Sequence, residues 1–345
     1  MQTVTHRSLP FVAVTFALGV ACGGAQDPEA PAADAPAAEA PSAEASGTGV
    51  APDGSETVEQ AAERALATIP ATGQFEVRGT KIFDPQGREF VMRGMNVDGP
   101  NWPWNRDVAQ DARLIVDVWK LNTIRAASYL RTFAHVTNNG DTDKIVDAYT
   151  KRGVVVMFGL QDYSGKYPEG EDLKKIVEFN RGLARKYKDN PYVWFNVMNE
   201  PGTCAGDGSV PAYWYTMNKA VIDAIRAEGA KNVIVVDGHG HGNENCGGGD
   251  LIPEKASAVL TYGQQLLGAD PQKRLVFDYH VYWFRTYETS GNKPAVANTV
   301  RRMRDYLQRV AAKKLAIIAG EITNGSGDGW CVPYGTQAVL QLAQE

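Results

Sequence analysis

The chain has 345 residues, of which 43% are hydrophobic and 22% are charged, and its formal net charge is −5. This composition gives ample material for a core and excludes the collagen, coiled-coil and small disulfide-scaffold classes. The negative charge lies in the first sixty residues, which carry eight acidic groups and one basic residue, Arg7. The remainder holds 34 basic and 32 acidic groups without a Lys/Arg run, which argues against nucleic acid as a partner.

The first 22 residues resemble a bacterial lipoprotein export signal. His6 and Arg7 form a short basic start, residues 9–21 are apolar or small, and Cys22 follows. We therefore expect an exported protein at the cell surface or outer membrane, with lipidated Cys22 as its only link to a membrane. The alternative is an ordinary secretory signal and a secreted protein. No internal apolar stretch approaches the ~20 residues of a membrane span.

Residues 23–72 are predicted to form a disordered tether and a lead-in. The stretch 23–60 is rich in Ala, Pro, Glu and Asp and has no basic group. Such a segment buries too little apolar surface to offset its ordering entropy, and its prolines and like charges keep it extended. The folded domain is expected over residues 73–345.

From about residue 73, strand-like and helix-like segments alternate along the chain. A small hairpin is predicted over residues 75–83, before the main fold. Helical patterns occur at 172–188, 213–227 and 297–312. Seven short runs, mostly continuously apolar, are typical of parallel strands that are covered on both faces. These runs are residues 90–96, 122–127, 154–160, 192–198, 232–237, 275–281 and 315–319.

The spacing of these strands favours an α/β fold of the (β/α)8 TIM-barrel type. Successive strands begin about 30 to 43 residues apart, and residues 93–96 lack the glycine fingerprint of an open doubly wound sheet. The seventh strand begins near residue 315, so an eighth would begin near residue 355, beyond Glu345. We therefore expect seven strands and a barrel that is truncated at its C-terminal end before strand eight.

Two glutamates come at the ends of predicted strands. Glu200 follows the run at 192–198, and Glu321 follows the run at 315–319 after one glycine. The carboxyl ends of barrel strands form the usual mouth of an active site. Two carboxylates at that mouth are what retaining glycoside hydrolysis requires, one as nucleophile and one as general acid/base.

Three further polar side chains end predicted strands. Arg125 ends the second strand, where its charge could hold a carboxylate ionised. His280 and Tyr282 end the sixth strand and share a face because alternate residues of a strand point to the same side. The alternatives are a surface arginine, a core histidine and an aromatic residue that fills the core.

These segments together resemble glycoside hydrolase family 5, the cellulase and β-mannanase family. The resemblance extends over roughly residues 74–345 and rests on five pieces in order. These are the segment 90–96 after the hairpin, Arg125, Asn199-Glu200-Pro201, His280-Val281-Tyr282 and Gly320-Glu321.

The resemblance implies that Glu200 is the general acid/base and Glu321 the nucleophile. It also implies that Asn199 binds the 2-hydroxyl of the sugar, where hydrogen bonds strengthen in the transition state. The implied enzyme uses no cofactor and no metal, and its partner is a polysaccharide substrate.

The resemblance assigns supporting roles to further side chains. Arg125 and Tyr282 would position Glu321, and His280 would line the sugar subsite on the acid/base side. The family commonly has a histidine at the end of strand three, where this chain has Gln161. Glutamine can bind a sugar hydroxyl but does not titrate, so we expect that contact to be altered.

Aromatic and histidine side chains in the loops are further substrate-binding candidates. His239 and His241 with the distant Cys246 would be a thin ligand set for zinc, so His239 or His241 is expected to contact the substrate instead. Four tryptophans follow strand ends, where their rings could stack on sugar rings; the alternative is that some cover the core. They are Trp102, Trp104, Trp283 and Trp330.

The cysteines of the body agree with export. Only Cys204, Cys246 and Cys331 remain after the signal, so one stays unpaired if two join. A bridge between Cys204 and Cys246 is one option in an oxidising compartment, but the spacing does not fix the connectivity.

The sequence thus predicts an exported, monomeric endo-β-1,4-glycanase that retains the anomeric configuration. Its substrate is β-mannan or cellulose. Mannan is slightly favoured, because residues 161–165 and the strand at 275–282 look more like the bacterial mannanase branch. The alternative is a catalytically impaired, truncated barrel that serves as a cell-surface carbohydrate-binding protein. That alternative arises because an open seven-stranded sheet exposes two edges.

Overall fold

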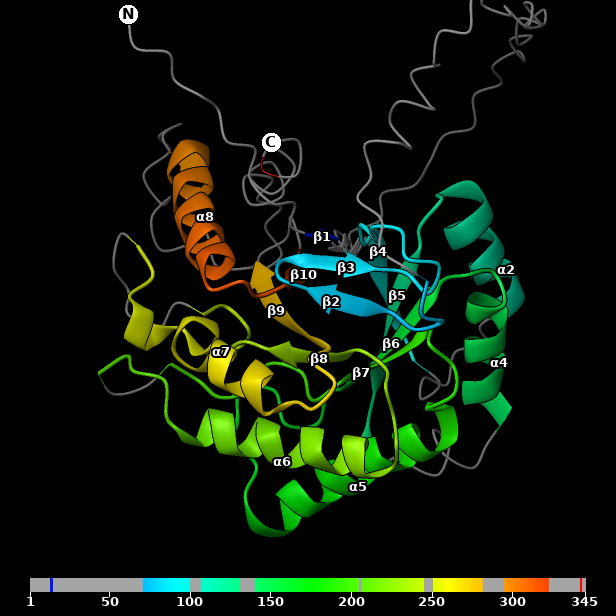
Figure 1. Cartoon of the computed structure of the whole chain (residues 1–345), viewed down its shortest axis with the longest axis horizontal. Helices are drawn as coiled ribbons and strands as arrows, with labels where there is room; N and C mark the ends of the chain where they lie inside the picture. The colour runs from blue at the N-terminus through cyan, green and yellow to red at the C-terminus, as the bar shows by residue number, and fades with distance from the viewer. Residues whose placement is uncertain are drawn as a thin grey trace, which may run out of the picture.

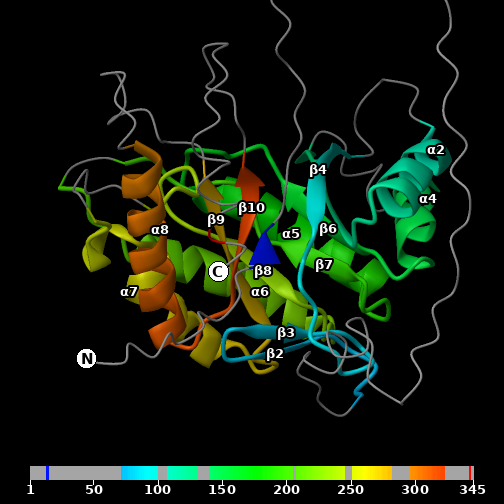
Figure 2. The ribbon, with the colours of Figure 1, turned by 90° about the horizontal axis from the view of Figure 1, so that it is seen from above.

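The computed structural model describes residues 13–14, 71–99, 107–130, 140–204, 207–244, 251–281, 295–322 and 342. Within these residues, seven parallel strands form a nearly closed barrel with helices around it (Figures 1 and 2). The strands follow one another in chain order, and each pairs in parallel with the next. They are β4 (Gly94–Asp98), β5 (Thr123–Ser128), β6 (Val155–Leu160), β7 (Val193–Asn196), β8 (Ile234–Asp237), β9 (Leu275–Val281) and β10 (Ile317–Ile322).

The seven-stranded barrel expected from the sequence is confirmed. Every residue of β6, β7 and β8 is buried, which explains why these runs are continuously apolar. The largest difference in a strand boundary is the start of β4, which lies at Gly94 and not at residue 90. Phe90 instead donates its backbone N–H to Ile82, so this part of the chain belongs to the hairpin.

A two-residue strand, β1 (Ala13–Val14), lies at the edge where an eighth strand of the barrel would pair. It runs parallel to β10, with Ala13 opposite Ile318 and Val14 opposite Ala319. The sheet order runs from β1 through β10 to β4, and among the described strands no pairing joins β1 to β4. The barrel is therefore nearly closed rather than closed.

The predicted hairpin covers the N-terminal end of the barrel. It consists of β2 (Glu76–Arg78) and β3 (Lys81–Phe83), which pair in antiparallel fashion. Phe75, just before β2, packs edge-on against Trp194 of β7 inside the barrel. Because this end is filled with apolar side chains, the opposite, C-terminal end is the one that can bind a ligand.

Helices alternate with the strands and cover the outside of the barrel (Figure 1). The predicted helix at 213–227 matches α6 (Tyr213–Ala227), and those at 172–188 and 297–312 correspond to α5 (Gly170–Tyr187) and α8 (Ala295–Ala312). No helix among the described residues is long and apolar enough to span a membrane. The remaining helices are α2 (Val108–Ala112), η1 (Arg113–Val118), α4 (Gly140–Thr150), η3 (Glu254–Ala256) and α7 (Ala258–Ala269).

Candidate active site

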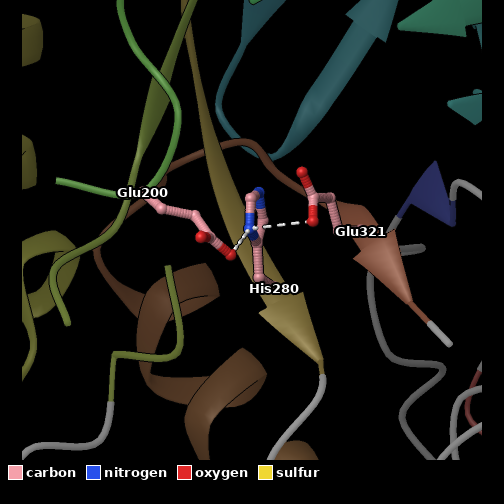
Figure 3. A group of neighbouring side chains, drawn as sticks. All are labelled: Glu200, His280 and Glu321. Carbon is pink, nitrogen blue, oxygen red and sulfur yellow. Dashed lines mark hydrogen bonds and ion pairs between the residues drawn. The ribbon is translucent and has the colours of Figure 1, made fainter. Parts of the chain in front are cut away.

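Glu200 and Glu321 meet at the C-terminal end of the barrel, on either side of His280. Figure 3 shows the imidazole of His280 between the two carboxylates. His280 Nδ1 lies 2.9 Å from Glu200 Oε1 and 3.6 Å from Glu321 Oε2. A carboxylate oxygen of Glu200 and one of Glu321 lie within 4.8 Å of each other. The two carboxylates and the imidazole of His280 thus form one cluster at this end of the barrel.

The backbone of Glu200 adopts an uncommon conformation that aims its side chain. Its φ of 51° lies in the left-handed region, which a non-glycine residue adopts only where the surroundings hold it. The N–H of Glu200 donates to Asp237 Oδ2 at 3.0 Å, and its carbonyl accepts from the N–H of Gly165 at 2.7 Å. Neighbouring segments on both sides therefore fix the position of Glu200.

The guanidinium of Arg125 is the buried centre of the site. Its Nη1 donates to Glu321 Oε1 at 2.6 Å. Its Nη2 lies 2.9 Å from Asn196 Oδ1, 2.6 Å from Asn199 Oδ1 and 3.3 Å from Asp237 Oδ2. The structure therefore brings Arg125 to Glu321, and it places Asn199 on the same cation.

Basic and acidic side chains are buried together next to the two glutamates. Burial disfavours the charge of Arg125, but Glu321, Asp237 and Asp278 outweigh this and raise the pKa of Arg125. Burial raises the pKa of Asp237 to about 6, against the effect of Arg125. Burial also lowers the pKa of His280, but Glu321 and Asp278 outweigh it and raise that pKa well above its usual value. These carboxylates therefore favour the protonated form of His280.

We expect the protein to lose thermal stability as the pH rises. Protonation of Asp237 makes its full contribution to stability at pH values below the ordinary pKa of 3.8. This contribution is lost as the pH rises through about 6, the pKa in the folded protein. The proton of His280 stabilises the fold fully below 6.5, and this contribution is lost as the pH rises through the higher folded pKa. Unfolding temperatures measured from pH 5 to pH 9 test this, with His280→Gln as the comparison. The variant should give a flatter curve above pH 6.5, and parallel curves would contradict the role of His280.

Asn199 is held by two side chains, of which only Arg125 was predicted as a site residue. Its Oδ1 accepts from Arg125, and its Nδ2 donates to Ser164 Oγ at 2.7 Å. Gln161 follows β6 as predicted, and its backbone N–H donates to the carbonyl of Ser128. Ser164 lies in the segment 161–165 that resembled the mannanase branch, but nothing in its local pattern marked it as a site residue.

The two histidines of the loop after β8 differ in their surroundings. His239 is 2% exposed, and its Nδ1 lies 2.5 Å from Tyr167 Oη while the two rings stack. Burial, with a smaller effect of His241, lowers the pKa of His239 to about 4. The side chain of His241 is 43% exposed, and its Nδ1 lies 3.8 Å from Glu200 Oε2. The substrate contact expected of His239 stays a prediction, and His241 is better placed to make one.

Glu244 anchors this loop, and sequence reasoning missed it. Its buried carboxylate accepts from the backbone N–H groups of His239, Ala258 and Val259 at 2.7, 3.0 and 3.0 Å, and from the hydroxyl of Ser257. The last three residues form the start of α7, so the carboxylate caps that helix as well as tying the loop to it. In the sequence Glu244 looks like an ordinary loop charge.

Several predicted site residues lie outside the described residues. Cys204 is described and is disulfide-bonded. The other cysteines lie outside the described residues, so its pairing with Cys246 or Cys331 stays a prediction. The other such residues are Cys22, Trp102, Trp104, Tyr282, Trp283 and Trp330.

Two groups of side chains are close enough together to hold a cation. Their ligand atoms lie within 4.8 Å of one another. The groups are Glu200, His280 and Glu321, and Asp237, Asp278 and His280. Arg125 already brings a positive charge to Glu321 and Asp237, so we interpret both groups as an ion-pair network.

Comparisons with known proteins agree with this geometry. Residues 83–345 match the family model "Cellulase (glycosyl hydrolase family 5)". The chain is 27% identical over 265 residues to a mannan endo-1,4-beta-mannosidase of Salipaludibacillus agaradhaerens, covering 74% of this chain and 73% of the relative. It is 26% identical over 263 residues to endoglucanase E-5 of Thermobifida fusca, covering 70% of this chain and 54% of the relative.

The fold is also that of solved structures of this kind. It is similar to the catalytic domain of a mannanase from Streptomyces sp. SirexAA-E, with a TM-score of 0.59, 21% identity and 80% of each chain covered. The match to the family model extends over most of the chain and includes both glutamates. The chain therefore belongs to glycosyl hydrolase family 5 and is a glycoside hydrolase.

Proposed function

We propose that this protein is a retaining endo-β-1,4-glycanase that cleaves β-mannan, with Glu321 as nucleophile and Glu200 as general acid/base. The observation that carries the proposal is the approach of their carboxylate oxygens to within 4.8 Å. Carboxyl groups of retaining glycosidases lie about 5–5.5 Å apart, and those of inverting enzymes lie about 6.5–9.5 Å apart to admit a water. The short separation favours direct attack by Glu321.

The reaction proceeds in two steps, in which Glu200 acts first as a general acid and then as a general base. In the first step, Glu321 forms a bond to the anomeric carbon, the glycosidic bond breaks, and Glu200 donates its proton to the leaving oxygen. In the second step, Glu200 takes a proton from a water that attacks the same carbon, and Glu321 leaves as a carboxylate. The overall reaction consumes one water and restores both side chains.

The buried side chains next to the two glutamates support both steps electrostatically. Arg125, 2.6 Å from Glu321, favours the ionised nucleophile before attack and again when it leaves. The hydrogen bond between His280 Nδ1 and Glu200 orients the acid/base. Ester formation removes the negative charge of Glu321, so the carboxylate form of Glu200 then faces one fewer like charge.

The remaining predicted residues are assigned to the substrate. Asn199, fixed by Arg125 and Ser164, is proposed to bind the 2-hydroxyl. Gln161 and either His239 or His241 are proposed to contact the sugar, as are Tyr282 and the tryptophans named above. The proposed partner is a polysaccharide alone, bound by a monomer.

Mannan is preferred to cellulose because three mannosidase relatives align with 74–75% of this chain, whereas the endoglucanase relatives align with 37–70% of it. A polymeric substrate also suits the proposed export. In this proposal, residues 1–22 direct the chain out of the cell, residues 23–72 form the spacer, and lipid on Cys22 anchors it.

Sugar release from the purified chain tests the proposal. We expect reducing ends to form from mannan faster than from carboxymethylcellulose, and proton NMR to detect the β-anomer as the first product. An α-anomer formed first would exclude double displacement, and faster release from carboxymethylcellulose would overturn the mannan preference. Binding of polysaccharide without any release would favour the alternative of a carbohydrate-binding protein.

A further inference from the structure

Asp278 lies beneath the two glutamates and has no role in the mechanism above. It is buried and belongs to β9, two residues before His280, so both side chains point to the same face of the strand. In the sheet it stands opposite Asp237 of β8 and Ile318 of β10. A carboxylate buried inside a barrel is costly unless other groups use its charge.

One oxygen of Asp278 binds the backbone just before Glu321. The pairing of β10 with β9 shifts register between Ile318 and Glu321, which marks an irregularity of the bulge type. The N–H of Gly320 donates to Asp278 Oδ1 at 2.5 Å within this irregularity. A Cβ on Gly320 would lie 1.8 Å from Asp278 Oδ2, so the carboxylate occupies the space that a side chain there would need. Bulges beside active sites re-aim side chains, and this one directly precedes Glu321.

The other oxygen of Asp278 faces His280. Asp278 Oδ2 lies 3.6 Å from His280 Nε2, while the opposite ring nitrogen, Nδ1, lies 2.9 Å from Glu200 Oε1. The partner of one ring nitrogen sets the proton and orientation of the other. The charged groups around this ring are Glu200 and Glu321 at Nδ1, Asp237 and Asp278 at Nε2, and then Arg125 and His241.

Asp237 is less available than Asp278 as a partner for the imidazole of His280. Its Oδ2 lies 3.4 Å from His280 Nε2, but the same oxygen accepts from Arg125 and from the N–H of Glu200. Within hydrogen-bond or ion-pair distance, the described partners of Asp278 are the imidazole of His280 and the backbone N–H of Gly320, and its effect on Arg125 acts at longer range.

We propose that Asp278 is a positioning residue that ties the two reacting carboxylates together. Its Oδ1 fixes the bulge that aims Glu321, and its Oδ2 keeps a proton on His280, which then presents Nδ1 to Glu200. The catalytic part of this inference rests on the proposed function. The structural part, a charge contact between Asp278 and His280, does not.

Asp278→Asn in the full chain is the first test, since the amide keeps an oxygen for Gly320 and loses the charge. Asp270→Asn is the matched control, because Asp270 is equally buried and pairs with Arg226 before β9 begins. NMR titration of the histidine ring signals, with His280→Gln for assignment, reports on His280 without any substrate.

We expect Asp278→Asn to lower the pKa of His280 and to move the alkaline limb of the kcat profile to lower pH. We also expect kcat to fall between about tenfold and a hundredfold, with KM almost unchanged, as for a slight misplacement of reacting groups. Asp270→Asn should change neither the titration nor the profile. An unchanged His280 titration in Asp278→Asn, or equal losses of kcat in both variants, would overturn the proposal. If the wild type releases no sugar, the proposed function fails, and the titration alone decides the contact.

A second test uses the space around Gly320 and does not depend on the asparagine variant. Gly320→Ala alone should abolish activity or folding, because its Cβ meets the carboxylate. Asp278→Ala combined with Gly320→Ala removes that overlap, so the double variant should be less impaired than the single Gly320→Ala protein. Losses that simply add would contradict the contact.

Discussion

Glu321→Ala is expected to lower kcat on mannan by at least about a thousandfold, which corresponds to about 4 kcal/mol of activation free energy. The methyl group cannot attack the anomeric carbon, so no glycosyl-enzyme forms. The fold should persist, because Arg125 keeps its contacts with Asn196, Asn199 and Asp237.

Azide distinguishes the two glutamates in this experiment. With an activated aryl β-mannoside oligomer, azide can enter the space left in Glu321→Ala and attack from the side opposite the leaving group, which gives an α-glycosyl azide. In Glu200→Ala the glycosyl-enzyme still forms, and azide then attacks it from the other face, which gives the β-glycosyl azide. The two products separate a missing nucleophile from a missing acid/base.

Glu228→Gln is the control for this pair of variants. Glu228 forms a surface ion pair with Arg185 of α5, and its loss should leave kcat unchanged. The opposite pattern of azide products would exchange the roles of Glu200 and Glu321. Wild-type rates in Glu321→Ala would remove Glu321 from the mechanism.

The elements that the sequence predicted best are those whose local pattern is strong. The strand at 275–281 and the helix at 213–227 agree with β9 and α6 at both ends. Continuous apolar runs and a helical apolar stripe are sufficient there. The start of β4 was wrong because the hairpin competes for the same segment, and no local pattern reports that competition.

The residues of the site also differ in how well the sequence predicts them. Arg125, His280 and Glu321 lie within strands, although Arg125 was expected at a strand end, and Glu200 follows β7. Each could be recognised by itself, and the structure brings them together. Asp278 stands inside an apolar run, where the sequence marks it only as an interruption, and Asp237 ends β8 but was not predicted as a site residue. Their role depends on which strands become neighbours, because Asp237 pairs with Arg125 of β5 and His280 of β9, and Asp278 accepts from the N–H of Gly320 in β10. Pairing of that kind is set by the tertiary fold.

Arg125→Ala is expected to lower the free energy of unfolding by about 3–5 kcal/mol, since it leaves the buried carboxylate of Asp237 without its guanidinium partner. The kcat of the folded fraction should also fall by at least about a hundredfold, because Glu321 loses both its charge partner and its fixed position. Chemical denaturation at pH 7 and kinetics on the same preparation measure the two effects separately.

Arg125→Lys separates charge from geometry at this position. Lysine keeps one positive charge, but its single ammonium cannot reproduce the planar fork that reaches Glu321 with one nitrogen and Asn196, Asn199 and Asp237 with the other. We expect it to recover part of the stability and little of the kcat.

Arg226→Ala provides the matched loss of a buried arginine outside the site. Arg226 of α6 pairs with Asp270, so this variant should lose stability while its folded fraction keeps the wild-type kcat. Two results would contradict a role for Arg125 beyond stability: a wild-type kcat in Arg125→Lys, or an equal fall of kcat in Arg226→Ala. The expected pattern would instead mean that the position of the guanidinium, more than its charge, makes Glu321 reactive.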